Sequence, residues 1–180
     1  MRDVVSKSGI LVLASHSPDL IAKECNRVIH MKATGTVPAV FTTYAFYNTD
    51  KFHFYGEDLI KRCMAFRSFL DAGIPAAAGS DFSPGPFAPL MGIQGMVTRK
   101  GWDGETWGAN QRVSVDEALR INTFNGAYAS REESIKGSIS PGKLADFVVL
   151  ADDLHTVDNE KIKDIQIVRT VVGGGTVYQA

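Results

Sequence analysis

Several motifs that hold metals or nucleophiles are missing from this 180-residue sequence. It contains no His-x-His, His-Glu-x-x-His or Cys-x-x-Cys pattern, so no short stretch supplies a zinc site by itself. It also lacks a Gly-x-Ser-x-Gly pattern, which argues against the nucleophile turn of α/β-hydrolases. The only two cysteines, Cys25 and Cys63, have no metal-ligand spacing, and we expect both to be buried free thiols in a reducing compartment.

An excess of charge is missing too, because 19 Lys and Arg residues face 20 Asp and Glu residues, for a net charge of −1. Such a balance creates no general field toward nucleic acid or anionic lipid, so we expect neither a nucleic-acid nor a membrane partner. The apolar run at residues 9–14 is too short for a secretory signal or a membrane span. The sequence therefore predicts a cytoplasmic protein.

Short apolar runs do occur, and they alternate with helix-like stretches. Strands that are separated by helices pair in parallel, so this order predicts an α/β fold. The expected strands span residues 10–14, 37–41 and 74–78; the expected helices span residues 19–33, 59–72, 90–98 and 115–129; a long loop is expected over residues 42–56.

The last part of the chain changes to strand-like patterning. Residues 147–150 and 165–172 are rich in β-branched and aromatic residues, and a run of three glycines, residues 173–175, leads into another such stretch. The glycines precede a strand instead of opening a helix, which favours a β-hairpin over a phosphate-binding loop.

Three polar side chains are candidates for chemistry. Asp81 follows the expected strand at residues 74–78, at the end of a parallel strand, where a carboxylate can bind a divalent metal or take a proton from water. It is the main candidate for both a catalytic and a metal-binding role, although an Asp after Gly-Ser also commonly caps a turn. His16, just past the run at residues 10–14, is a second candidate metal ligand, with solvated surface as the alternative. His53 could contact a substrate or merely pack within its loop.

Three longer stretches resemble a known family. They are residues 69–74 leading into Gly79-Ser80-Asp81, residues 114–119 together with 125–127, and residues 137–150. The third stretch is specific as a whole, and its Pro-Gly turn leads into a buried strand. From about residue 35 to its end the sequence resembles the amidohydrolase superfamily, in the branch of D-aminoacylases and N-substituted formamide deformylases.

The resemblance implies a TIM-like (β/α)8 barrel that holds one or two divalent metals, usually zinc. A barrel of this type needs about 250 residues. We therefore expect the last three or so β/α units of a partial barrel over residues 1–136, and the C-terminal β strands of a small β-sandwich domain over residues 137–180. In this picture Asp81 ends the eighth strand, contacts the metal and shuttles the proton of the hydrolytic water. His16 corresponds to the histidine that ends the sixth strand.

The implied activity is that of a metal-dependent hydrolase acting on carbon–nitrogen bonds in small-molecule amides, other than peptide bonds. Because most of the family's metal ligands are missing, we expect the chain to be inactive alone and to hold metal poorly. The alternative is a non-catalytic oligomerising or binding module that keeps only the scaffold. In either case a cut barrel leaves open strand edges, which predicts a homo-oligomer.

Overall fold

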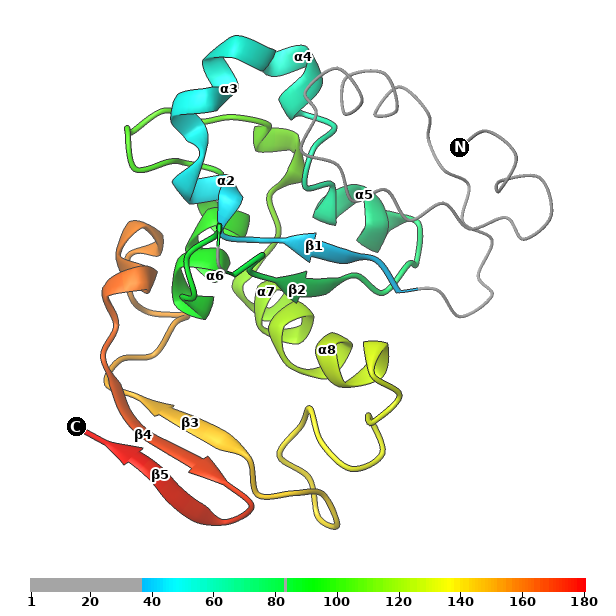
Figure 1. Ribbon diagram of the computed structural model, residues 1–180, viewed down its shortest axis with the longest axis vertical. Coiled ribbons are helices and arrows are strands. Elements are labelled where there is room, and N and C mark those ends of the chain that lie inside the picture. Colours follow the sequence, from blue (N-terminus) through cyan, green and yellow to red (C-terminus); the bar gives the residue numbers. More distant parts are fainter. Residues whose placement is uncertain (1–36, 83) are drawn as a thin grey trace, which may run out of the picture. The chain divides into compact units, whose positions relative to one another are not determined.

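The computed structural model describes residues 37–82 and 84–180 (Figure 1). The strand and helix expected before residue 34 lie outside these residues, as do His16 and Cys25. The described part is a mixed α/β structure with short strands. Its elements are β1 (Ala39–Phe41), α2 (Tyr44–Tyr47), α3 (Thr49–Tyr55), α4 (Glu57–Ile60), α5 (Phe66–Asp71), β2 (Ala77–Gly79), α6 (Pro89–Thr98), the 3-10 helix η1 (Ala109–Gln111), α7 (Val115–Asn122), α8 (Phe124–Ala129), β3 (Phe147–Leu150), the 3-10 helix η2 (Asn159–Asp164), β4 (Ile167–Val172) and β5 (Gly175–Gln179).

Strands β1 and β2 pair in parallel, as the sequence predicts, and lie side by side in Figure 1. Their register sets Ala39 against Ala77 and Phe41 against Gly79, so both strands end at the same edge. Helix α8 is linked to this pair of strands by one hydrogen bond. The buried side-chain amide of Asn125 donates it, at 2.7 Å, to the carbonyl oxygen of Ala76. The polar side chain thereby satisfies a backbone group that burial would otherwise leave unpaired.

The hydrophobic core gathers around helix α6. It joins α5, the start of β2, α7 and the segment that contains η2. Ile162 and Ile165 from that segment are buried in it beside Met96 of α6, so residues well after 137 share a core with the helices. The fully buried members of this cluster are Phe66, Ala76, Met96, Ala118, Ile121 and Ile162.

The expectation of a long loop over residues 42–56 was wrong, because most of this stretch forms helices α2 and α3. Ala45, Thr49 and Phe52 are buried there, at the spacing of one helical face. The apolar periodicity could not be recognised in the sequence because Thr49, a polar residue, occupies one of the buried positions. Its side chain is completely buried despite its hydroxyl group.

The single helix expected over residues 59–72 was also wrong, because α4 and α5 are separate helices. Where the helix was expected to continue, side chains from other segments donate hydrogen bonds to its backbone carbonyl oxygens. Arg99 donates to the carbonyl oxygens of Ile60 and Cys63, both at 3.4 Å, and Gln111 donates to that of Lys61 at 3.1 Å. Met64 then turns the chain with a positive φ of 48°.

Helix α7 begins as predicted. The hydroxyl of Ser114 accepts a hydrogen bond from the backbone N–H of Glu117, and the Glu117 carboxylate accepts one from the backbone N–H of Ser114. This capping box satisfies two backbone donors of the first turn. The helix ends at Asn122, earlier than predicted, and α8 starts afresh after Thr123, whose backbone angles are not helical.

The last three strands form an antiparallel sheet in the order β3-β4-β5, and the predicted hairpin is confirmed. Gly173 and Gly174 make its turn with φ angles of 57° and 81°, which side chains other than glycine rarely allow. Many apolar side chains of this sheet remain exposed. They are Phe147, Val148 and Val149 of β3, Ile167, Val168 and Val172 of β4, and Val177 and Tyr178 of β5, and we call them the exposed sheet residues.

Candidate functional site

Asp81 lies two residues beyond the end of β2, in a backbone conformation with a positive φ of 55°. Such a conformation is uncommon for a residue other than glycine and marks a tightly held turn. Its half-buried carboxylate accepts a 2.7 Å hydrogen bond at Oδ2 from the phenol of Tyr44. The two residues are 37 positions apart in the sequence, so the fold creates this pair.

The parallel pairing of β1 and β2 brings the two side chains together. The backbone N–H of Thr42 continues the ladder by donating 3.0 Å to the carbonyl oxygen of Gly79. The hydroxyl of Thr43 donates 3.4 Å to the carbonyl oxygen of Ser80. Tyr44 and Asp81 therefore both follow the carboxyl ends of neighbouring parallel strands, where functional groups of α/β proteins gather.

Burial, together with the hydrogen bond and the negative charge of Asp81, raises the pKa of Tyr44 to about 12. The phenol therefore stays protonated at physiological pH and acts as a donor to the carboxylate. It cannot act as a base there, and it holds one carboxylate oxygen in place, while no hydrogen bond within residues 37–82 and 84–180 is recorded at Oδ1.

The turn after Asp81 is capped by a different residue. The backbone N–H of Phe82 donates 3.3 Å to the hydroxyl of Ser80, while the Asp81 carboxylate is directed to Tyr44. Farther on, the backbone N–H of Gly85 donates 2.8 Å to the carbonyl oxygen of Asp81. Asp81 thus supports the loop through its backbone and leaves its side chain for the Tyr44 pair.

Gly85 fixes the path of this loop. It is buried, and a Cβ atom added there would lie 2.0 Å from the carbonyl oxygen of Ser80 and 3.2 Å from the ring of Tyr44. No side chain fits at such a distance, so the loop folds back onto the strand end only because residue 85 is glycine. The loop therefore passes close to the ring of Tyr44 at the strand end.

His53 lies in helix α3, and the structure gives it different neighbours. Its ring packs edge-on against Trp107 with a centroid distance of 5.0 Å, and its Nε2 lies 3.9 Å from Oδ2 of Asp103. Within the described part, none of its recorded contacts is with Asp81 or Tyr44. These neighbours favour local packing, and a role in substrate binding stays a prediction.

A metal site is not complete in this part of the chain. Across residues 37–82 and 84–180, no group of three or more His, Cys, Asp or Glu side chains could hold a metal ion. A catalytic zinc site takes three protein ligands. The carboxylate of Asp81 and the protonated phenol of Tyr44 therefore do not fit a divalent metal by themselves, and His16 lies outside the described residues.

Sequence reasoning missed Tyr44, although a signal for it existed. Tyr44 stands three residues after the expected strand at 37–41, and Asp81 stands three residues after the expected strand at 74–78. In a parallel pair these equivalent positions meet at one edge. Reading residues 42–56 as an irregular loop concealed the match.

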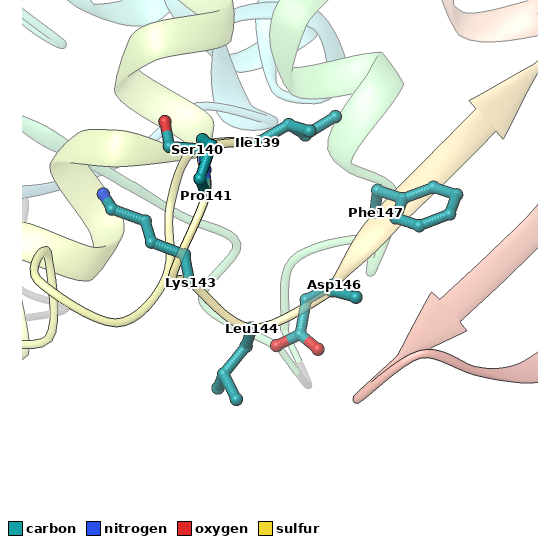
Figure 2. Close-up of a pocket in the computed structure, with 8 residues that line it drawn as sticks. Ile139, Ser140, Pro141, Lys143, Leu144, Asp146 and Phe147 are labelled. Atoms are coloured by element: carbon teal, nitrogen blue, oxygen red, sulfur yellow. The ribbon is translucent and has the colours of Figure 1, made fainter.

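A separate hollow lies at the start of β3, away from the residues predicted for the site. Figure 2 shows this hollow, which is lined by the turn at residues 139–146 and by the ring of Phe147. Its lining is mostly apolar, with Ile139 and Leu144 among the exposed side chains. The hollow continues the apolar surface of the exposed sheet residues.

None of the helices in the described part is long and apolar enough to cross a membrane.

Comparison with known proteins extends these observations beyond the described residues. The Bacillus subtilis (strain 168) protein YtcJ is 33% identical over 127 residues, which cover 69% of this chain and 24% of YtcJ. The N-substituted formamide deformylase of Arthrobacter pascens is 35% identical over 113 residues, which cover 63% of this chain and 21% of the deformylase. The chain thus spans about a quarter or less of the length of these relatives.

A solved structure is similar as well. It is an uncharacterized metal-dependent hydrolase from Pyrococcus horikoshii, with a TM-score of 0.59 and 18% identity over 79% of this chain and 28% of its own. A likeness at this identity concerns the fold alone, and it supports an α/β fold of the TIM-barrel type. The sequence model of the amidohydrolase family matches residues 19–178, and the chain belongs to that family.

Proposed function

We propose that this chain supplies Asp81 to a site that hydrolyses carbon–nitrogen bonds in small-molecule amides other than peptide bonds. The observation that carries the proposal is the hydrogen bond from Tyr44 to a half-buried carboxylate at the end of a parallel strand. Membership of the amidohydrolase family and the similarity to an N-substituted formamide deformylase point to the same reaction class.

The reaction needs a group that moves one proton. Hydrolysis of an amide forms a bond between a water oxygen and the carbonyl carbon, and it breaks the bond from that carbon to nitrogen. The Asp81 carboxylate takes the proton from the attacking water and passes it to the departing nitrogen, which leaves as an amine. Tyr44 positions the carboxylate through Oδ2, so that Oδ1 is the oxygen that receives the proton.

A divalent metal, zinc by family resemblance, belongs to the proposed complete site. Its further ligands are proposed to lie outside the described residues, either in residues 1–36, where His16 is the candidate, or on other polypeptide. The finer architecture is likewise a proposal. It consists of the last β/α units of a barrel over residues 1–136 and the C-terminal strands of a small β domain over residues 137–180, in a cytoplasmic protein.

A chimaera tests the proposal in a complete site. The segment of the Arthrobacter pascens deformylase that matches this chain would be replaced by the corresponding residues of this chain, and turnover of an N-substituted formamide would be measured. Asp81→Asn should abolish turnover, because an amide side chain cannot accept the proton from water. The matched control Asp152→Asn changes an exposed aspartate and should leave turnover unchanged.

Circular dichroism shows whether each chimaera is folded. A folded Asp81→Asn chimaera that turns over its substrate at the unsubstituted rate would remove Asp81 from the chemistry. Full loss of turnover in the Asp152→Asn chimaera would show that the assay reports the fold instead of the site.

The second candidate function is a non-catalytic module that associates with a second copy of itself. The exposed sheet residues favour it, since an interface that covers apolar side chains of all three strands would remove them from water. In the described part, β3 and β5 each pair on one side only, and open edges of this type invite pairing with another chain. Self-association is compatible with the hydrolase proposal, but catalysis is not required for it.

A further inference from the structure

The ring of Tyr44 meets a second aromatic ring, which comes from the end of β1. Phe41 is the last residue of that strand, and its ring stands edge-on to the ring of Tyr44, with a centroid distance of 5.9 Å and an interplanar angle of 80°. This geometry sets the positive edge of one ring against the negative face of the other, which is favourable for an aromatic pair. Phe41 therefore contacts the residue that donates to the Asp81 carboxylate.

Gly79 makes room for the ring of Phe41. The two residues face each other in the parallel register of β1 and β2, which lie side by side in Figure 1. A Cβ atom added to Gly79 would lie 3.3 Å from Cδ1 and 3.6 Å from Cε1 of Phe41, so the ring covers the place where a side chain of residue 79 would begin. The ring thus packs on the neighbouring strand, and the alignment of the two strands sets its position.

The loop after β2 approaches the same tyrosine. A Cβ atom added to Gly85 would lie 3.2 Å from Cε1 of Tyr44. The tyrosine ring therefore has Phe41 as one neighbour and the backbone of Gly85 as another, while its hydroxyl donates 2.7 Å to Oδ2 of Asp81. Only two side-chain torsions place a tyrosine ring, so contacts with the ring decide where the hydroxyl lies.

We infer that Phe41 is a positioning residue, whose ring orients the phenol of Tyr44 and thereby holds the Asp81 carboxylate in place for proton transfer. The inference rests on the proposed function for the role of Asp81 and adds a residue to the same site. The ring contact of Phe41 is with Tyr44, so its effect on the carboxylate passes through the tyrosine. Proton transfer needs heavy atoms within hydrogen-bond reach, and a small displacement of the base slows it.

The environment of the phenol supports this role. Burial is the largest of the causes that raise the pKa of Tyr44 to about 12, and the hydrogen bond and charge of Asp81 add to it. Without the ring of Phe41, Tyr44 would be more exposed to water and its phenol would be less firmly held against Asp81. Both changes lower the pKa of Tyr44 toward its ordinary value of 10.

Titration of the full 180-residue chain tests the inference without any need for turnover. Ultraviolet absorbance against pH follows the late phenol, which Tyr44→Phe identifies by removing it. In Phe41→Ala this phenol should titrate at least about one pH unit lower than in the unsubstituted chain. Phe41→Leu keeps an apolar side chain but lacks the ring edge, so it should lower the titration less.

Phe87→Ala is the matched control. It also removes an exposed phenylalanine ring, which lies on the loop after β2, is 76% exposed and has its ring contact with Phe82. The late phenol should titrate in this variant as in the unsubstituted chain. An equal downward shift in Phe87→Ala would overturn the inference, because the effect would then not be specific to Phe41.

Circular dichroism shows whether each variant is folded. A folded Phe41→Ala protein whose late phenol still titrates at about 12 would overturn the inference. If Phe41→Ala does not fold, Phe41→Leu decides: a lowered titration in that variant supports the inference, and an unchanged one overturns it.

The deformylase chimaera adds a kinetic test of the path through Tyr44. Phe41→Ala should lower kcat about tenfold and change KM less than about twofold, because it displaces the base and leaves substrate binding alone. In a chimaera that already carries Tyr44→Phe, the same substitution should lower kcat little further, since the hydroxyl that Phe41 orients is gone. Equal losses in both backgrounds would overturn the inference, because Phe41 would then act by another route.

The inference and the proposed function fail separately. A lowered titration in Phe41→Ala, combined with a fully active Asp81→Asn chimaera, would keep Phe41 as the residue that orients Tyr44 and reject Asp81 as the base. Loss of turnover in the Asp81→Asn chimaera, combined with an unchanged titration in Phe41→Ala, would keep the base and reject Phe41 as its positioning residue.

Discussion

The phenol of Tyr44 and the carboxylate of Asp81 form a 2.7 Å hydrogen bond across the ends of two parallel strands. This one contact orients the only carboxylate that we assign to catalysis. It also makes Tyr44 an indicator of the site, because the properties of its phenol report on the neighbouring charge.

Tyr44 should titrate at a higher pH than a tyrosine in water does. The sequence has five tyrosines, and the environment of Tyr44 raises its pKa to about 12. The neutral phenol is favoured in the folded state, so this contribution to stability is complete below pH 10, the ordinary tyrosine pKa, and is lost as pH rises through about 12. Ultraviolet absorbance against pH should show a late-titrating phenol that is lost in Tyr44→Phe and kept in the control Tyr47→Phe. Retention of the late phenol in Tyr44→Phe would contradict the structure.

The isolated chain should bind zinc poorly and show negligible amidase activity. The physical reason is the absence of a three-ligand group from the described residues. Elemental analysis after dialysis against zinc, followed by turnover assays with N-acyl amino acids and N-substituted formamides, checks this. Stoichiometric zinc together with turnover would show that the 180 residues already contain a complete site.

Arg99 should stabilise the fold more than an exposed arginine does. It is completely buried, and burial lowers its pKa to about 10. Its guanidinium donates to the carbonyl oxygens of Ile60, Cys63 and Trp107. Arg99→Met should lower the free energy of unfolding by about 2 kcal/mol, because the lost hydrogen bonds outweigh the relief of burying a charge.

Urea denaturation measures this difference, and Arg112→Met is the control. Arg112 is exposed and donates one hydrogen bond, to the carbonyl oxygen of Thr98. We expect a loss of at most about 1 kcal/mol for that variant. Equal losses of unfolding free energy in the two variants would mean that the buried position of Arg99 adds nothing to the stability of the fold.

The chain should self-associate through the exposed sheet residues. Val148 and Tyr178 are both about half exposed, at 51% and 50%, and both align with Thr170 across the sheet. Val148→Lys should shift the protein toward monomer in light scattering of dilute samples, because it places a charge in an apolar contact. Phe54→Lys, in helix α3, should not. A stable monomer of 19.5 kDa that unfolds cooperatively would refute the prediction.

The features that sequence alone predicted are local ones. The capping box of Ser114 and Glu117 needs residues three positions apart, and the hairpin after β4 needs glycines where φ is positive. Asp81 could be placed at a strand end because the short apolar run at residues 74–78 precedes it by a few positions. Each of these features depends on a short segment of chain and little else.

The features that sequence missed depend on distant partners. The helix expected over residues 59–72 is interrupted where Arg99, more than 30 residues away, takes the carbonyl groups of Ile60 and Cys63. Tyr44 pairs with Asp81 only after β1 and β2 have aligned. No periodicity within a single segment contains that information, because tertiary contacts overrode the local pattern.

Gly85 also limits how this loop can be redesigned. A Cβ atom at position 85 would lie 2.0 Å from the carbonyl oxygen of Ser80, and the backbone N–H of Gly85 donates to the carbonyl oxygen of Asp81, so a side chain there would fit only if the backbone near Asp81 shifted. Residues 82 and 87 face outward and carry no such restriction. Directed evolution of this loop should therefore accept exchanges at these two positions and reject exchanges of Gly85, so that the loop surface can change while Asp81 keeps its place.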